Sequence, residues 1–214
     1  MLLAYLEGGA DAGQLVAWIV AVTLAITVHE YAHARRALAA GDHTPLESGR
    51  VTLNPLAHYD PVGTTFFLLA GFGWAKPVPV NPAAFRNRRW DSLWVALWGP
   101  LSNLILAAVL GVVLRLGVTG VYTDAVAFLV LANLALAVFN LIPIGPLDGA
   151  HILEAILPSK QRHKLQLFYA RYGQIMVMAA IFALFVPPFS HITRLALMLP
   201  IRLLFGLLTG ASGI

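Results

Sequence analysis

The sequence has no cysteine and little charge, and both absences limit what the chain can be. Of its 214 residues, only 11% are charged and 59% are hydrophobic, whereas a soluble domain has about 25% charged residues. With a mean hydropathy of +0.77, the chain is expected to be an integral membrane protein. The absence of cysteine excludes disulfides, thiolate metal ligands and a cysteine nucleophile.

The basic residues give the chain a formal net charge of +4 at pH 7, but their positions do not indicate nucleic acid as a partner. They lie between apolar runs, as in the cytoplasmic loops of membrane proteins. Residues 1–13 carry no Lys or Arg, so the basic region of a signal peptide is missing. Arg35 and Arg36 follow the first apolar run directly. This asymmetry predicts an external N-terminus and a cytoplasmic end for the first span.

Apolar runs predict an all-α polytopic membrane protein with about five to six membrane segments in one domain over residues 1–214. Spans suited to a bilayer core of about 30 Å are expected over four stretches, residues 14–40, 93–116, 123–142 and 165–186. Residues 62–75 are apolar but short and glycine-containing, which predicts a short or re-entrant segment returning to the cytoplasmic side. Residues 191–210 are interrupted by two arginines and a proline, and form either a last span or an interfacial helix.

Two polar stretches share a short pattern that favours extended structure. Residues 51–55 read Val-x-Leu-Asn-Pro, and residues 78–82 read Val-x-Val-Asn-Pro. Proline confines such a segment to the edge of a sheet, so we expect small β-hairpin or edge-strand elements at the cytoplasmic membrane surface. Such an edge is able to receive an extended peptide by strand addition. A plain surface loop fits these residues equally well.

The pattern H-E-x-x-H occupies residues 29–33, at the end of the first apolar run. In a helix, positions i and i+4 lie about 40° apart and one turn along, so His29 and His33 face one metal ion. Glu30 lies about 100° round the helix from His29, within reach of a water on that metal without being a ligand. Ionisable groups at the end of a membrane helix are costly unless they have partners or a function. The pattern therefore predicts a zinc hydrolase site near the cytoplasmic face.

A catalytic zinc with two histidine ligands needs a third protein ligand, commonly a carboxylate. Most of the other acidic residues lie in loops or at the far face, which leaves Asp148 and Glu154. Asp148 follows a proline-broken stretch at residues 143–146, and counting spans puts it at the same depth as His29. Irregular backbone is tolerated at membrane depth only where protein or a cavity surrounds it. Alternatively, Asp148 caps a helix that begins near Ala150.

Two motifs together resemble the site-2 protease family of intramembrane zinc metalloproteases. They are the H-E-x-x-H pattern of residues 29–33 and the pattern N-x-x-P-x-x-P-L-D-G of residues 140–149. Residues 53–58, 73–80 and 99–103 resemble a compact prokaryotic branch of this family that has no PDZ or CBS domain. The resemblance covers most of the chain between the first span and the second motif.

The resemblance implies a role for each residue of the two motifs. His29, His33 and Asp148 are expected to bind one Zn2+ per chain, with Glu30 as the catalytic base. Asn140 is expected to contact the substrate or the developing oxyanion. The implied reaction is hydrolysis of peptide bonds in or near the transmembrane segments of membrane-protein substrates, within the lipid bilayer of a prokaryotic cell membrane.

Two other functions stay open from the sequence. A membrane metal-ion transporter would use the same residues as a transit site, although transport needs a path to both faces and these residues gather near one. A non-catalytic membrane scaffold related to a protease is the second alternative, against which the intact motif argues.

Four further polar residues have unassigned roles. His43 and His58 lie in polar loops near the cytoplasmic face, and a loop histidine is usually just solvated. For His151, a surface histidine or one that supports the site from outside fits better than a metal ligand. For Asn133, a hydrogen bond between helices fits better than a catalytic role.

Overall fold

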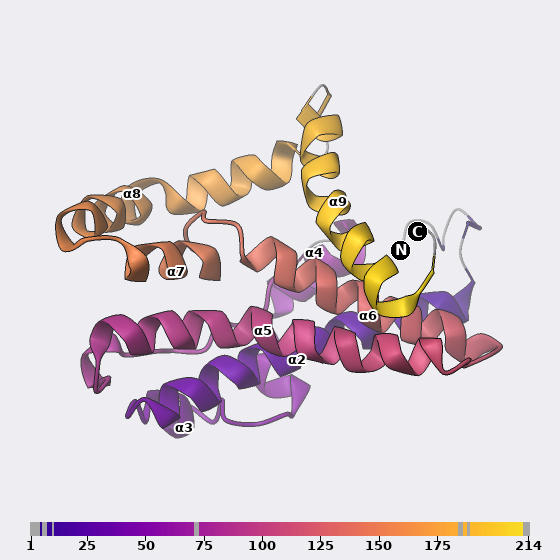
Figure 1. The fold of residues 1–214 in the computed structure, drawn as a ribbon, viewed down its shortest axis with the longest axis horizontal. Coiled ribbons are helices and arrows are strands. Elements are labelled where there is room, and N and C mark those ends of the chain that lie inside the picture. Colours follow the sequence, from indigo (N-terminus) through magenta and orange to yellow (C-terminus); the bar gives the residue numbers. More distant parts are fainter. Residues whose placement is uncertain are drawn as a thin grey trace.

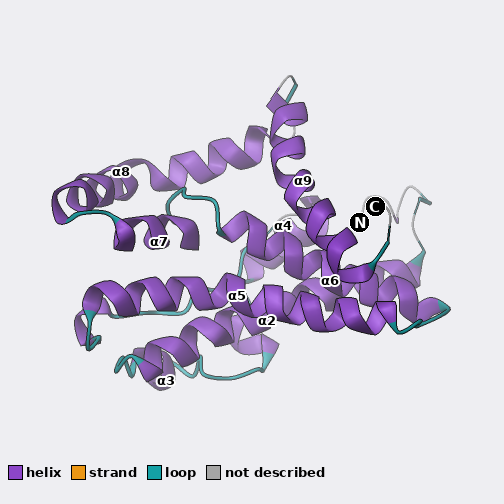
Figure 2. Cartoon of the chain, in the orientation of Figure 1, coloured by secondary structure: helices purple, strands orange, loops and turns teal. Residues whose placement is uncertain are grey.

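The structure is a computed structural model that describes residues 5, 8–9, 11–70, 73–183, 186–187 and 189–211. Helices make up all the regular structure of these residues (Figures 1 and 2). In chain order they are α2 (Ala12–Ala39), α3 (Thr44–Glu47), η1 (Pro55–His58), α4 (Pro61–Ala70), η2 (Pro82–Ala84), α5 (Arg88–Arg115), α6 (Val121–Asn140), α7 (Asp148–Ile156), α8 (Ser159–Ala183) and α9 (Phe189–Thr209). The predicted all-α class is confirmed for this part of the chain.

Within the described ranges, four helices are long and apolar enough to cross a membrane: α2, α5, α6 and α9. The predicted count of five to six membrane segments is therefore not supported. Helix α8, which covers most of the span predicted over residues 165–186, is not among the four. Its polar side chains, including Lys160, Lys164 and Arg171, lower its hydropathy. The tail that the sequence left undecided is helix α9, with the length and composition of a span.

The β-hairpin and edge-strand elements predicted at residues 51–55 and 78–82 were wrong: the described residues contain no strand. Each Asn-Pro pair begins a 3-10 helix instead. Asn54 Oδ1 accepts the N–H of Leu56 at 3.1 Å, and Asn81 Oδ1 accepts the N–H of Ala83 at 3.1 Å. Asparagine at the N-cap with proline at the first helical position is a common start for a helical turn. The repeated pattern therefore marks two helix starts.

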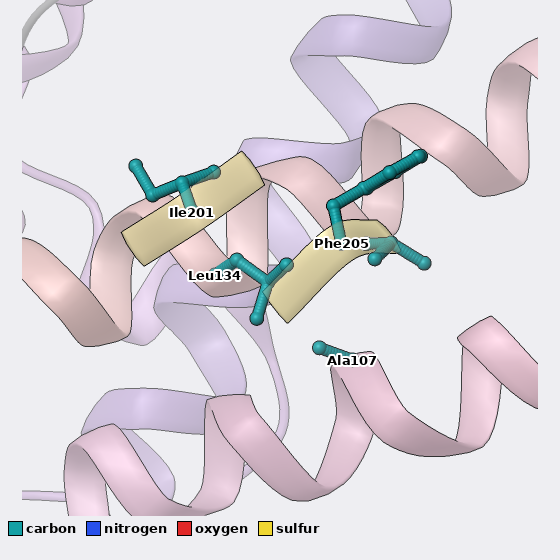
Figure 3. Close-up of a cluster of buried hydrophobic side chains, with 5 residues drawn as sticks. Ala107, Leu134, Ile201 and Phe205 are labelled. Atoms are coloured by element: carbon teal, nitrogen blue, oxygen red, sulfur yellow. The ribbon is translucent and has the colours of Figure 1, made fainter. Parts of the chain in front are cut away.

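Helices α2, α5 and α6 lie side by side, and α9 packs across α5 and α6 (Figure 1). Where α9 crosses them, Ala107 of α5 and Leu134 of α6 lie against Ile201 and Phe205 of α9, all of them buried (Figure 3). Small residues at such crossings let membrane helices approach closely. This packing fixes α5 and α6 in place, and α2 lies along both.

Helix α4 belongs to a loop whose two ends meet. Its 10 residues span about 15 Å at 1.5 Å per residue, half the thickness of a bilayer core. After it, the backbone of Gly73 and Trp74 lies so close to Gly63 that a Cβ on Gly63 would overlap the Trp74 carbonyl. The N–H of Lys76 then donates to the His58 carbonyl at 3.0 Å. The short segment predicted from the sequence is thus a chain that turns back to where it began.

The loop segment of residues 76–81 is held to the end of α2 by the buried carboxylate of Asp42. Asp42 Oδ2 accepts the N–H of Asn81 at 2.7 Å, and Oδ1 accepts the N–H of Thr44 at 3.0 Å. Burial raises the pKa of Asp42, but the hydrogen bonds from Thr44 and Asn81 outweigh it, and the pKa lies below its ordinary range. The ionised side chain therefore joins this segment to the helix that carries the H-E-x-x-H pattern.

The variant Asp42→Asn is expected to unfold at a lower temperature than the wild type. An amide offers one acceptor oxygen where two N–H donors need acceptors, which costs about 1–3 kcal/mol. Because its pKa is depressed, wild-type Asp42 stabilises the fold above the unfolded-state value of about 3.9, and that stabilisation is lost as the pH falls further. Thermal unfolding in detergent at several pH values measures both effects. Glu47→Gln, at an exposed site, is the control; equal melting of both variants would contradict this role.

Candidate metal centre

The two histidines of the H-E-x-x-H pattern lie on one face of α2 and point toward α5. His29 is 5% exposed and His33 is 9% exposed. Gly99 of α5 faces both rings, and a Cβ there would overlap His33 and crowd His29. The absence of a side chain at Gly99 therefore provides the space that the two imidazoles occupy.

Asp148 is the first residue of α7, and the N-cap of that helix is Leu147, which makes no side-chain capping bond. The alternative role for Asp148 as a helix cap is therefore not adopted. Gly149 lies directly against the backbone at the end of α6, where a Cβ would overlap carbonyl oxygens. At the other end of α7, the Arg89 guanidinium donates to the Ala155 and Ile156 carbonyls. Helix α7 is thus held at both ends, with its first side chain directed at α2.

The structure brings His29, His33 and Asp148 together, as the sequence predicts. The two Nε2 atoms lie 3.1 Å apart. His29 Nε2 lies 3.2 Å from Asp148 Oδ2, and His33 Nε2 lies 3.3 Å from Asp148 Oδ1. Zinc bonds of about 2.0–2.1 Å in a tetrahedron put neighbouring ligand atoms about 3.3–3.4 Å apart. The three side chains therefore fit the ligand set of one zinc ion.

The outer nitrogen of each imidazole is already bonded. His33 Nδ1 lies 2.7 Å from the Val95 carbonyl, and His29 Nδ1 lies 2.7 Å from Asn103 Oδ1. Carbonyl oxygens only accept, so each Nδ1 carries a proton, and each ring in its neutral form directs the lone pair of Nε2 at Asp148. Asp148 Oδ2 is buried and accepts no hydrogen bond. With both rings neutral, these facing lone pairs are stabilised by a positive charge between them, and one metal ion supplies it to all three side chains at once.

Glu30 lies beside the histidines and bonds to Val78, a contact that the sequence did not predict. Its Oε2 accepts the backbone N–H of Val78 at 3.2 Å. Val78 lies in the loop segment of residues 76–81, which therefore passes along the edge of the centre. The proline pattern on either side of Val78 predicted extended backbone but did not predict its partner.

Asn140 is half-buried at the last turn of α6, and its Nδ2 donates to the Leu136 carbonyl of the same helix at 3.0 Å. This bond does not join Asn140 to the two histidines or to Asp148, so its role in the reaction stays a prediction. Asn133 accepts a hydrogen bond from Asn103 at 2.8 Å, which is the interhelical bond expected for it.

The three remaining histidines that the sequence left unassigned lie apart from the metal ligand set. His43 and His151 are exposed. His58 is buried, and its Nε2 lies 3.0 Å from the Thr52 carbonyl. Among the described residues, the only group of His, Asp and Glu close enough to share an ion is His29, His33 and Asp148.

Gly99→Ala is expected to weaken Zn2+ binding about tenfold to a hundredfold, because overpacking of about 1–3 kcal/mol falls directly on the two imidazoles. Chelator competition with the purified protein measures the affinity. Gly111→Ala is the matched control on the same helix, since its Cβ would meet Leu208 of α9 instead. Wild-type Zn2+ affinity in Gly99→Ala would contradict the assignment of this space.

Comparison with known proteins agrees with the geometry. The sequence model of peptidase family M50 matches residues 116–184, the part of the chain that holds Asn140 and Asp148. The putative zinc metalloprotease YwhC of Bacillus subtilis is 38% identical over 157 residues, which cover 69% of this chain and 72% of that protein. The putative zinc metalloprotease Rip2 of Mycolicibacterium smegmatis is 32% identical over 183 residues, which cover 71% of this chain and 68% of that protein. No solved structure matches the chain.

The family explains why ionisable groups stand on helices of membrane-spanning length and composition. The described residues contain four such helices. The histidine pair lies on one of them, α2, and faces another, α5. The chain belongs to peptidase family M50, the site-2 protease family, and is a zinc metalloprotease with the apolar helices of a multi-pass membrane protein.

Proposed function

We propose that the chain is an intramembrane protease that hydrolyses peptide bonds in or near the transmembrane segments of membrane-protein substrates. One Zn2+ per chain is held by His29, His33 and Asp148, within a single domain over residues 1–214. The observation that carries the proposal is the meeting of two imidazole nitrogens and a carboxylate, all within 4.8 Å of one another, against buried faces of apolar helices.

Glu30 is the proposed general base. When bound, Zn2+ supplies Lewis-acid chemistry, lowering the pKa of water and polarising the scissile carbonyl. Glu30 takes the proton of the attacking water and later returns it to the leaving amine. Its position beside His29 in the sequence of α2 keeps its carboxylate next to the ligand set without making it a ligand. The Val78 N–H, 3.2 Å from Oε2, limits the freedom of this carboxylate.

The proposed orientation puts the N-terminus outside the cell and the metal centre near the cytoplasmic face. Arg35 and Arg36 follow the histidine pair directly, and Arg36 pairs with Asp91 at the start of α5 at 3.1 Å. Excess Lys and Arg mark the cytoplasmic ends of spans. A site at this depth needs only a short path for water.

The loop segment of residues 76–81 is the proposed docking place for the unwound substrate. A substrate helix hides its carbonyls in i→i+4 hydrogen bonds, so it must unwind before attack. Pro77 and Pro79 donate no N–H, and the N–H of Val78 between them donates to Glu30 at 3.2 Å, so this stretch passes directly beside the proposed base. Asn140, at the end of α6, is proposed to contact the substrate or the developing oxyanion.

Glu30→Gln is expected to keep Zn2+ and to lose cleavage of a transmembrane substrate by about a hundredfold or more, since an amide cannot accept the water proton. Cleavage of a fluorogenic transmembrane peptide in detergent, with metal analysis of the same sample, measures both. Glu47→Gln, an exposed glutamate to glutamine change on α3, is the matched control. Full activity of Glu30→Gln would defeat this mechanism.

His33→Ala and Asp148→Ala are each expected to lose bound metal as well as activity, because each removes one of three protein ligands. Metal content of the purified variants, with thermal unfolding to verify folding, measures this. Stoichiometric Zn2+ in both variants would remove these residues as ligands. Metal flux into liposomes without peptide cleavage by the wild type would instead favour a transporter.

A further inference from the structure

Asn103 of α5 is a buried polar residue bonded to the metal centre but outside its ligand set. Its side chain is 0% exposed, and its Oδ1 lies 2.7 Å from His29 Nδ1. An amide inside an apolar span is costly unless its hydrogen-bonding groups are satisfied. Asn103 belongs to the stretch of residues 99–103 that resembles the site-2 protease family, but the sequence predicted no separate role for it, so the bond to His29 requires its own explanation.

The orientation of the Asn103 amide follows from its other partners. Nδ2 donates to the Ala25 carbonyl at 2.9 Å and to Asn133 Oδ1 at 2.8 Å. A backbone carbonyl only accepts, so the nitrogen must lie on the Ala25 side and the oxygen must face His29. Asn133 is oriented in the same way, because its own Nδ2 donates to the Leu129 carbonyl at 2.8 Å.

This orientation determines where His29 carries its proton. Because Asn103 Oδ1 only accepts, the proton of a neutral His29 ring lies on Nδ1, and Nε2 keeps the lone pair that faces Asp148. His33 is oriented by the backbone carbonyl of Val95 at 2.7 Å, which no substitution removes. Of the two imidazoles, His29 is therefore the one whose tautomer depends on a side chain.

We propose that Asn103 is a positioning residue: it selects the tautomer of His29 that presents Nε2 to Zn2+ and holds the ring in that direction. Asn133 and the Ala25 carbonyl hold Asn103 in turn. These hydrogen bonds, together with the bond to His29, form a relay that joins α2, α5 and α6. The inference rests on the proposed metal site. Removing the outer hydrogen-bond partner of a ligating imidazole typically weakens metal binding about 10–100-fold.

The test measures Zn2+ affinity of the detergent-purified full chain by competition with a chromogenic chelator. Asn103→Leu keeps the approximate volume and removes the acceptor, and is expected to bind Zn2+ about 10–100-fold more weakly. Asn133→Leu is the matched comparison, since it removes a buried amide that holds Asn103 but leaves the bonds of Asn103 to His29 and Ala25. Its Zn2+ affinity is expected to fall much less than that of Asn103→Leu, even though both variants lose stability.

Asn103→Asp tests whether an acceptor alone restores Zn2+ binding. It keeps an oxygen facing His29 but loses the N–H groups that donate to Ala25 and Asn133. It is expected to bind Zn2+ more tightly than Asn103→Leu. The visible spectrum of the Co2+-loaded protein, which reports ligand geometry, should change in Asn103→Leu and be retained in the other two variants. If Asn103→Leu is not monodisperse, Asn103→Ala removes the same acceptor and takes its place.

Wild-type Zn2+ affinity in folded Asn103→Leu would overturn the inference, as would equal losses of affinity in Asn103→Leu and Asn133→Leu. The outcome is separable from that of the proposed function, because it is read without substrate. If the wild type and the variants bind Zn2+ in the expected order of affinities but the wild type cleaves no substrate, the proposed protease function is wrong and the proposed role of Asn103 is supported.

Discussion

Two imidazoles and one carboxylate direct their lone pairs at one another in a part of the molecule that is mostly closed to solvent. The rest of the structure depends on this close approach. His29 and His33 of α2 and Asp148 of α7 approach one another within about the spacing of zinc ligands. When both imidazoles are neutral, their lone pairs and the carboxylate repel one another, and a low-dielectric interior strengthens that repulsion. The fold must therefore hold the three side chains together and leave a place for the positive charge between them.

Several features of the fold serve this end. Gly99 leaves space for the two imidazoles. The packing of α5 and α6 against α9 holds these two helices in place beside α2. Arg89 holds the C-terminal end of α7. Buried polar groups are costly in such surroundings unless they are paired. Asn103 meets that condition by bonding to His29 and to Asn133, and Asn133 meets it by bonding to Asn103 and to the Leu129 carbonyl.

Sequence reasoning succeeded where the geometry is local or set by the membrane. Helical periodicity alone puts His29 and His33 on one face, and counting spans brings Asp148 to the same depth. It failed where side chains bond to a nearby backbone: the Asn-Pro pairs of residues 54–55 and 81–82 cap 3-10 helices instead of ending strands. It overestimated α8 as a span, because charged and amide side chains interrupt its apolar run. Asn103 and Val78 were missed because their partners lie on distant segments, and no pattern along the chain records a contact between helices.

The central claim is that His29, His33 and Asp148 bind a single Zn2+, and X-ray absorption at the zinc edge of the loaded protein tests it most directly. The account predicts one zinc per chain, with nitrogen and oxygen neighbours at about 2.0–2.2 Å and the outer scattering of two imidazoles. Alanine at either histidine should reduce that imidazole scattering or abolish binding. A zinc spectrum without imidazole scattering, or one unchanged when His29 and His33 are both replaced, would contradict the account.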